Sequence, residues 1–354
     1  MIHNKNKHKY YALYMKKNIT VVYPRIKGNS GTRSYVENTF NGLDRIGVQY
    51  NKIGITKREI SVNGKPYFGI LFQYLSALTK SGKSKIVHAL SPDVVIKGTN
   101  IVTIHDIIPF TNSEIYMKSI YDKLAYKLSF SRSLKIDNIL ISTEVGRKVF
   151  LDHTKIPEER VKVVHHSIDH SKFFPETTDP YPDKNKINIV MVSDFNPRKR
   201  IDLIIDTVGG DDEINFYHIG PTQGWSDRYS SLLKISRKFS NVKFLGPLDY
   251  KLMREYITFA DLFVFLSESE GFGLPPLEAM ACGTNTLVND LPVFHETLGD
   301  KAFFSNLTKF EKNDILNAIN KKKSRSELIN YSLRFSISEY ANNLNDIYNL
   351  ELTR

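Results

Sequence analysis

Short apolar runs along the chain alternate with stretches in which apolar residues recur every three or four positions. The runs have the length of strands, and the stretches between them have the period of amphipathic helices. In the first half we predict a helix at 34–47 and strands at 18–24, 85–90, 100–106, 138–143 and 161–167. In the second half we predict strands at 187–193, 214–220, 241–246 and 260–267. Strands that are apolar on both faces and separated by helices indicate parallel α/β layers.

A proline-rich segment separates the two series. Residues 175–186, PETTDPYPDKNK, hold three prolines and few apolar side chains, which favours a linker. At roughly 150 residues per domain, a chain of 354 residues has room for two domains. We therefore predict a Rossmann-like N-terminal domain at 15–178 and a Rossmann-like C-terminal domain at 179–335. A terminal helix at 336–354 is expected to pack back on the N-terminal domain.

The composition is that of a globular protein. With 41% hydrophobic and 25% charged residues, the chain is not a disordered, collagen-like or coiled-coil protein. No apolar run approaches the roughly 18 residues that a membrane helix needs. The single cysteine, Cys282, excludes an internal disulfide and a cysteine-rich metal cluster. We expect a cytoplasmic protein.

The net charge of +11 is unevenly distributed. Eight lysines and arginines, and no acidic residue, lie between Met1 and Val36. We interpret residues 1–14 as a solvated basic extension, and contact of this extension with anionic lipid stays open. The charge also suggests a nucleic-acid binder, but it does not lie on a folded face with interleaved aromatic residues. We expect no nucleic-acid partner.

The most informative segment is EGFGLPPLEAMACG, which runs from Glu270 to Gly283. It follows the predicted strand 260–267, at the end where open α/β sheets bind ligands. Its first two glycines let backbone approach a ligand closely, and its two prolines fit the first turn of a helix that Gly283 ends. The helix N-terminus would offer N–H donors and partial positive charge to an anion. Glu278, which we place in the first turn, can accept hydrogen bonds from a ribose diol.

A run of cations follows the first strand of the second domain. Arg198, Lys199 and Arg200 could hold a diphosphate, the arginines through paired hydrogen bonds and the lysine as a point charge. No two aspartates are spaced D-x-D, so the usual manganese-binding pair of one major class of sugar transferase is absent. Neighbouring His165 and His166 would face opposite sides of a strand, and we expect no metal site there.

The Glu270–Gly283 segment resembles the E-x7-E signature of the retaining glycosyltransferases of GT-B family four. The resemblance extends over most of the chain. It includes Ser30–Val36, Ile101–Asp106, Ile141–Glu144, Pro157–Pro175, Asn196–Lys199 and Phe244–Gly246. It implies the α/β GT-B fold, in which two Rossmann-like parallel-sheet domains face each other across a cleft.

The resemblance also implies an activity. Members transfer a hexose from a UDP- or GDP-sugar to a hydroxyl of a glycan, a glycolipid or a protein-linked glycan, with retention of configuration. It places His105, Asp106 and Glu270 at the reacting sugar. It implies donor-binding roles for Gly31, Arg198, Lys199, Gly220, Phe272, Gly273, Leu274 and Glu278. The family lysine that contacts the donor diphosphate corresponds to Lys199, and no metal or other cofactor is expected.

The chain departs from the family pattern beside the predicted phosphate site. Ser193 and Asp194 stand where some members carry an arginine, which leaves Arg198 or Arg200 as the second cation. His166 stands where the family run NGVD begins.

Residues 115–135 predict a helix with one apolar face. That face consists of Met117, Ile120, Tyr121, Leu124 and Leu128, and it is flanked by lysines and arginines. We expect the face to pack on the core. Peripheral contact of a basic amphipathic helix with an anionic membrane stays open as the alternative.

The main alternative function is a non-catalytic protein that binds sugar nucleotides through the same fold. The complete set of Glu270, Glu278, Lys199 and His105 favours the enzyme. The sequence leaves the sugar, the base and the acceptor open.

Overall fold

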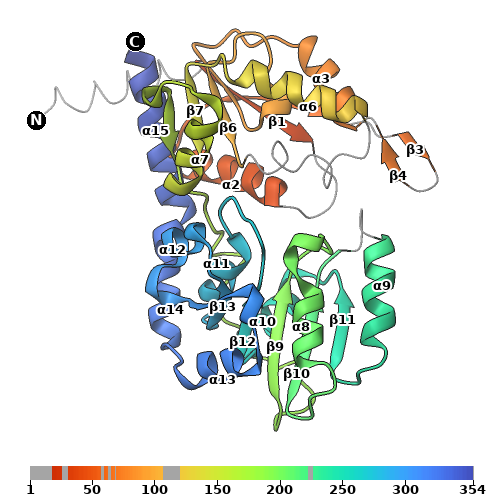
Figure 1. Ribbon diagram of the computed structural model, residues 1–354. Helices are drawn as coiled ribbons and strands as arrows, with labels where there is room; N and C mark the ends of the chain where they lie inside the picture. Colours follow the sequence, from red (N-terminus) through yellow and green to blue (C-terminus); the bar gives the residue numbers. More distant parts are fainter. Residues whose placement is uncertain are drawn as a thin grey trace, which may run out of the picture. The chain divides into compact units, whose positions relative to one another are not determined.

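The computed structural model describes residues 18–25, 31–56, 60–62, 65–67, 69–106, 120–221 and 226–353. The chain divides into two compact units (Figure 1). Unit 1 comprises Met1–Ser167 with Ile337–Arg354, and unit 2 comprises Ile168–Ser336. The predicted basic extension lies outside the described residues, as do Ser30 and Met117.

Unit 1 is built on a parallel sheet with the described strand order β2-β1-β5-β6-β7-β8. Its strands are β1 (Ile19–Arg25), β2 (Asn51–Thr56), β5 (Ile86–Ala89), β6 (Ile101–Ile104), β7 (Asn138–Ile141) and β8 (Val161–Val163), and a separate hairpin is formed by β3 (Ile60–Val62) and β4 (Lys65–Tyr67). Its helices are α2 (Gly31–Arg45), α3 (Gly69–Leu78), α6 (Ile120–Ser133), α7 (Glu144–Thr154) and α15 (Ile337–Thr353), with short 3₁₀ turns at Pro92–Val94 and Glu158–Arg160. The terminal helix α15 packs against α2.

Unit 2 repeats the design with the described order β11-β10-β9-β12-β13-β14, again parallel. Its strands are β9 (Ile187–Val192), β10 (Ile214–Ile219), β11 (Val242–Gly246), β12 (Leu262–Phe265), β13 (Thr286–Asn289) and β14 (Phe303–Ser305). Its helices are α8 (Ile201–Val208), α9 (Ser226–Ser236), α10 (Tyr250–Phe259), α11 (Leu274–Ala281), α12 (Pro292–Leu298), α13 (Lys312–Asn320) and α14 (Arg325–Ser332). Short 3₁₀ turns lie at Pro197–Lys199, Gly299–Lys301, Leu307–Lys309 and Leu333–Phe335. The prediction of an α/β protein with two parallel-sheet layers is confirmed.

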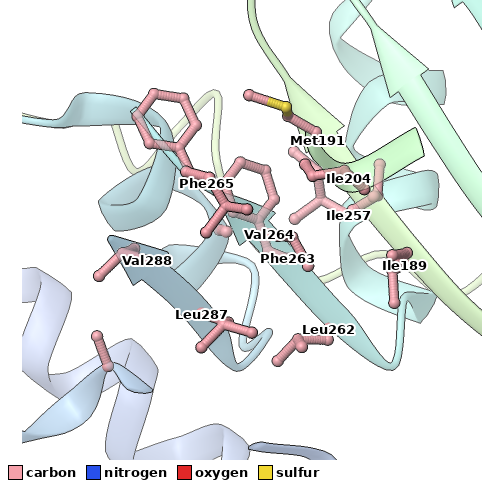
Figure 2. Packing of buried hydrophobic residues seen from close by; sticks show 14 of the residues in the cluster. Ile189, Met191, Ile204, Ile257, Leu262, Phe263, Val264, Phe265, Leu287 and Val288 are labelled. Atoms are coloured by element: carbon pink, nitrogen blue, oxygen red, sulfur yellow. The ribbon is translucent and has the colours of Figure 1, made fainter. Parts of the chain in front are cut away.

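Both sheets are buried on their two faces, because successive residues of a strand point to opposite faces and both faces are covered by apolar clusters. In unit 1, Ile19 and Val21 of β1 join one apolar cluster, whereas Val22 joins the cluster on the other face. In unit 2, β12 lies between β9 and β13, and all of its side chains are buried (Figure 2). This arrangement explains why the strands read as continuous apolar runs.

The proline-rich segment differs from the predicted linker. In the structure, the division between the units comes at residue 168, and the segment packs on unit 2. Tyr181 is fully buried there, and its hydroxyl donates to the Tyr256 carbonyl at 2.6 Å. Glu176 pairs with Arg254. The buried Tyr181 side chain and the Glu176–Arg254 ion pair therefore hold the segment on unit 2 despite its low apolar content.

The apolar face predicted on 115–135 does not pack on the core, so that prediction is wrong for the described part of the helix. Ile120, Tyr121, Leu124 and Leu128 of α6 are exposed. The buried side of α6 is instead made mainly of small and polar residues, namely Asp122, Ala125, Ser129 and Ser133, together with Phe130. Small side chains allow a helix to approach its neighbours closely, and here they define the inner face.

Candidate functional site

The candidate site of unit 2 lies where two neighbouring strands end. β9 and β12 pair in parallel; β10 and β11 lie on one side of them, and β13 and β14 lie on the other. Such a reversal of strand order leaves room for a ligand beyond the carboxyl ends of the strands. Residues 193–200 follow β9 and residues 266–273 follow β12, so the predicted cations and the predicted loop meet there.

Glu270 is held by two cations at this point. Lys199 Nζ lies 2.5 Å from Glu270 Oε1, and Arg198 Nη1 contacts the same oxygen. The exposed side-chain fractions are 8% for Lys199, 10% for Glu270 and 20% for Arg198. Two positive charges and one negative charge give 2 − 1 = +1 for these three side chains, which we call the Glu270 cluster, and the Asp194 carboxylate also acts on Lys199. A mostly buried net positive charge is suited to receiving an anion.

Charge and burial compete in setting the ionisation of this cluster. Burial alone would raise the pKa of Glu270, but the attraction of Lys199 and Arg198 outweighs it and holds the pKa below its usual value. Burial lowers the pKa of Lys199, and Glu270 opposes that shift. The Lys199 ammonium also lies 4.4 Å from the centre of the Phe265 ring, which adds a cation–π contact.

Arg198 also fixes the loop that carries Glu270. It donates to Ser267 Oγ at 3.0 Å and contacts the Ser269 carbonyl. Asn289, at the end of β13, donates from its amide to the Ser267 carbonyl at 3.0 Å. Ser267 and Asn289 were not among the site residues predicted from the sequence. Their position at the ends of adjacent strands is the signal that could have identified them.

Arg200 is engaged elsewhere. Its guanidinium lies 3.0 Å from Glu268 Oε1 and 3.3 Å from Asp202 Oδ2, and all three side chains are about a third exposed or more. The backbone of Arg200 is left-handed, with φ +50°, which turns the chain from the 3₁₀ turn into α8. Of the two candidates for a second cation, Arg198 is therefore the one that joins the Glu270 cluster.

Helix α11 begins at Leu274, directly after Gly273. Gly273 has φ +90°, and a Cβ there would lie 2.4 Å from the Phe294 ring, so glycine is required at this position. Residues 275 and 276 are prolines without an N–H group, which leaves Leu274 as the one donor among the first three helical residues. The helix end thus offers fewer donors than the sequence analysis predicted.

Glu278 is the fifth residue of α11 and lies in its second turn, so its predicted place in the first turn is wrong. The helix starts before its two prolines, which moves Glu278 away from the N-terminus. The carboxyl is partly buried, and this burial raises its pKa to about 7, although Lys172 acts in the opposite direction. A carboxyl that titrates near neutrality is a feature of functional sites.

Gly220 and Phe272 contribute through their backbones. Gly220 follows β10, and a Cβ there would lie 1.7 Å from the Ser193 carbonyl oxygen, so the turns after β9 and β10 touch. The Phe272 side chain is buried in the core, edge-on to Phe335. Thr297 donates to the Phe272 carbonyl at 3.2 Å and holds this part of the loop.

In unit 1, His105 and Asp106 follow β6, the strand next to β5. His105 Nε2 lies 3.0 Å from the Leu90 carbonyl, so this nitrogen donates and Nδ1 carries the lone pair. His166 Nε2 lies 3.4 Å from that Nδ1, and the Tyr35 ring stands edge-on at 4.6 Å. Burial lowers the pKa of His105 to about 4, which keeps the ring neutral. The role of His166 was missed because the family pattern has a different residue there.

The predicted site residues thus fall into two groups. Arg198, Lys199 and Glu270 are in direct contact in unit 2, and Gly220, Phe272, Gly273, Leu274 and Glu278 lie on neighbouring turns or on α11. Gly31, the first residue of α2, belongs to unit 1 together with His105 and Asp106.

Among the described residues, no group of three or more histidine, cysteine, aspartate or glutamate side chains is arranged to hold a metal ion. None of the helices in the described ranges is both long and apolar enough to span a bilayer.

Comparison with known proteins gives a family match in unit 2. Residues 176–335 match the family Glycosyl transferases group 1. Together with the fold, this match supports a GT-B glycosyltransferase. The chain is 26% identical over 261 residues to the O-antigen chain mannosyltransferase RfbU of Salmonella typhimurium, an alignment that covers 68% of this chain and 67% of RfbU.

Solved structures of known proteins share the fold of this chain. The sucrose-phosphate synthase of Thermosynechococcus elongatus superposes with a TM-score of 0.73 at 13% identity, over 94% of this chain and 99% of the synthase. Anabaena HepE, solved in complex with UDP and glucose, superposes with a TM-score of 0.69 at 15% identity, over 94% of this chain and 99% of HepE.

Proposed function

We propose that the chain is a retaining glycosyltransferase of GT-B family four. It transfers a hexose from a nucleotide-diphosphate sugar to a hydroxyl of a glycan or a lipid-linked glycan. The observation that carries the proposal is the Glu270 cluster, a buried group of net charge +1 at the strand-order reversal of unit 2. The match of residues 176–335 to a glycosyl transferase family supports it.

In the proposed reaction the two cations stabilise the leaving group. The bond between the anomeric carbon and the phosphate oxygen breaks, and negative charge develops on the diphosphate. Lys199 and Arg198 are already positioned in a site from which water is largely excluded, so they lower the energy of that charge without reorganising. The same two cations provide the charge that a metal ion supplies in other transferases, and we propose that no metal is needed.

Retention follows from attack on the face that the leaving group vacates. The acceptor oxygen forms its bond to the anomeric carbon on that face, and the departing phosphate oxygen takes the acceptor proton. Glu270 gives up part of its pairing when the diphosphate competes for Lys199 and Arg198. Its carboxylate is then available to the sugar as positive charge develops on the ring.

This proposal assigns Glu278 to donor binding, and His105 and Asp106 to catalysis. Glu278 accepts hydrogen bonds from the ribose diol, and burial raises its pKa although Lys172 partly opposes that shift. The assignment of His105 and Asp106 to catalysis at the sugar is carried by the resemblance to family four. Neutral His105 has a fixed tautomer, because its Nε2 donates to the Leu90 carbonyl.

The relatives suggest which donors to test first. RfbU is named a mannosyltransferase, and HepE was solved with UDP and glucose. We therefore propose GDP-mannose and UDP-glucose as the leading donors and a glycan as the acceptor. A panel of UDP-, GDP- and ADP-sugars in a thermal-shift assay identifies the donor, since a ligand that binds the folded state raises Tm.

A second assay separates the enzyme from a non-catalytic binding protein of the same fold. The selected donor is incubated with mono- and disaccharide acceptors, and release of the nucleoside diphosphate is measured together with the glycoside product. An enzyme releases nucleoside diphosphate in step with product. A donor that raises Tm but gives no product with any acceptor supports the binding protein, and the absence of a Tm shift with every nucleotide sugar contradicts both.

A further inference from the structure

Two neighbouring helices of unit 1 expose large apolar side chains. On α3, Phe72, Leu75 and Leu78 are exposed, and on α6 the exposed fractions reach 76% for Ile120 and 57% for Leu124. The two helices pack side by side (Figure 1), and the Leu71 N–H donates to Asp122 Oδ1 at 3.1 Å between them. We define the α3–α6 face by its exposed apolar residues Phe72, Leu75, Leu78, Ile120, Tyr121, Leu124 and Leu128.

The polarity of both helices is the reverse of that of an ordinary surface helix. The residues that α3 buries include Gln73 and Ala77, and α6 buries chiefly small and polar residues. The larger apolar side chains point outward, where water penalises them. On a soluble protein, a contiguous exposed patch of this kind marks an interaction surface.

Charge indicates what that surface contacts. Residues 71–78 of α3 carry no charge, and α6 carries Lys123, Lys127 and Arg132. The single acid in these stretches, Asp122, is buried against α3. The exposed and partly exposed charges in these two stretches are therefore all positive, and Lys80 lies two residues beyond the end of α3.

We propose that the α3–α6 face docks on an anionic membrane surface. The apolar residues enter the boundary between headgroups and acyl chains, and the lysines and the arginine contact the acidic headgroups. A second copy of this chain is a poor occupant, because a symmetric contact would bring the same cations together in a chain of net charge +11. The docking is independent of the proposed catalytic activity.

The test uses the full chain and lipid vesicles in a flotation assay. Vesicles contain either phosphatidylglycerol and phosphatidylcholine in equal amounts or phosphatidylcholine alone. We expect binding to the anionic vesicles that falls as salt is raised. The double variant Leu124→Gln/Leu128→Gln should weaken this binding at least about tenfold, and Lys123→Gln/Lys127→Gln should weaken it by roughly fivefold for each cation removed.

Three controls make the result specific. Leu350→Gln removes an equally exposed apolar residue from α15 and should leave binding unchanged. Lys5→Gln/Lys7→Gln/Lys9→Gln removes charge from the N-terminal segment, the other basic part of the sequence, and should retain most of the binding. The Tm of each variant should match that of the parent, because every replaced side chain on the face is exposed or partly exposed.

A fluorescence reading complements flotation. The chain has one tryptophan, Trp225, so Leu128→Trp in a Trp225→Phe background places a single reporter on the face. A blue shift of its emission on adding anionic vesicles supports insertion. Unchanged binding in Leu124→Gln/Leu128→Gln, loss of binding in the N-terminal variant alone, or a parent dimer that becomes monomeric in Leu124→Gln/Leu128→Gln would overturn the proposal.

Discussion

Lys199 Nζ lies 2.5 Å from Glu270 Oε1 in a cluster that is about nine-tenths buried. The two residues are far apart in sequence, yet they come together because β9 and β12 are neighbours. The pair combines a cation suited to phosphate with a carboxylate that a phosphate would displace. The proposed chemistry of the site depends on this relationship.

A double-mutant cycle on Lys199 and Glu270 tests whether the pair is energetically coupled. Lys199→Ala should lower the free energy of unfolding by about 1–3 kcal/mol, since Arg198 remains to pair with Glu270. Glu270→Gln should lower the free energy of unfolding more than Lys199→Ala does, because it leaves two cations without their carboxylate. The double variant should cost less than the sum of the single variants, by at least about 1 kcal/mol. Denaturant unfolding measures all three.

Arg200→Ala serves as the matched control for that cycle. Arg200 pairs with Glu268 and Asp202 on a more exposed surface, so its loss should cost at most about 1 kcal/mol. Additive effects of Lys199→Ala and Glu270→Gln would show that the contact contributes nothing to the folded state.

Replacing either glutamate of the E-x7-E segment should reduce activity, but through different kinetic constants. A ribose contact exists equally in the ground state and the transition state, so Glu278→Gln should chiefly raise the donor KM. Glu270 lies with the cations that face the leaving group, so Glu270→Gln should chiefly lower kcat. Initial rates at varied donor concentration separate the two effects. A pure kcat loss in Glu278→Gln, or an unchanged kcat in Glu270→Gln, would reverse these assignments.

The titration of Glu278 predicts a pH dependence near neutrality. Its pKa in the folded protein is about 7, raised by burial from 4.5, so the carboxyl loses its proton as pH rises through 7. The charged form accepts stronger hydrogen bonds from the ribose. The kcat/KM for donor should therefore fall as pH drops below about 7, and Glu278→Gln should abolish this limb of the profile. A limb that persists in the variant belongs to another group.

The same raised pKa has a consequence for stability. The folded protein binds the Glu278 proton more tightly than the unfolded chain does, so proton binding at Glu278 stabilises the folded state. This stabilisation is fully present below about pH 4.5 and is lost as pH rises through 7. Glu278→Gln should be more stable than the parent at pH 8 and nearly equal to it at pH 4.5. A site residue that costs stability is consistent with a functional role.

Removal of divalent metal tests the role given to the cations. We expect transfer to proceed at an unchanged rate in EDTA, because Lys199 and Arg198 supply the positive charge that the diphosphate needs. Activity is measured before and after chelation and after adding back Mg²⁺ or Mn²⁺. Loss of activity in EDTA with restoration by one ion would show that the two side chains are insufficient.

Much of this site could be predicted from sequence because its chemistry lies at strand ends. The cations after β9 and the loop after β12 follow long apolar runs, so their meeting point depended only on two parallel strands being neighbours. Strands β2, β13 and β14 were not predicted from the sequence. β2 and β14 are edge strands, β2 is interrupted by Gly54, and β14 has three residues. β13 lies between β12 and β14, but only Leu287 and Val288 of its four residues are apolar.

The sequence could not show how burial is distributed among similar side chains. Arg198 and Arg200 look equivalent in the chain, and the left-handed backbone at Arg200 is what sends one to Glu270 and the other to Glu268. The apolar stripe of α6 likewise predicted a core-facing helix, whereas tertiary packing buries the opposite side. The helical period of apolar residues shows that they share one face of the helix, but it does not show whether other elements of the fold cover that face.

Calorimetric titration of nucleoside diphosphates tests whether Lys199 holds the diphosphate of the donor. UDP, GDP and ADP are titrated into the parent, Lys199→Ala and Arg200→Ala at several salt concentrations. We expect at least one of the three nucleotides to bind the parent. Lys199→Ala should raise the Kd of that nucleotide by about tenfold or more, and Arg200→Ala should leave the Kd within about twofold of the parent value. Equal affinity of the parent and Lys199→Ala at every salt concentration, or no binding of any of the three to the parent, would contradict these expectations.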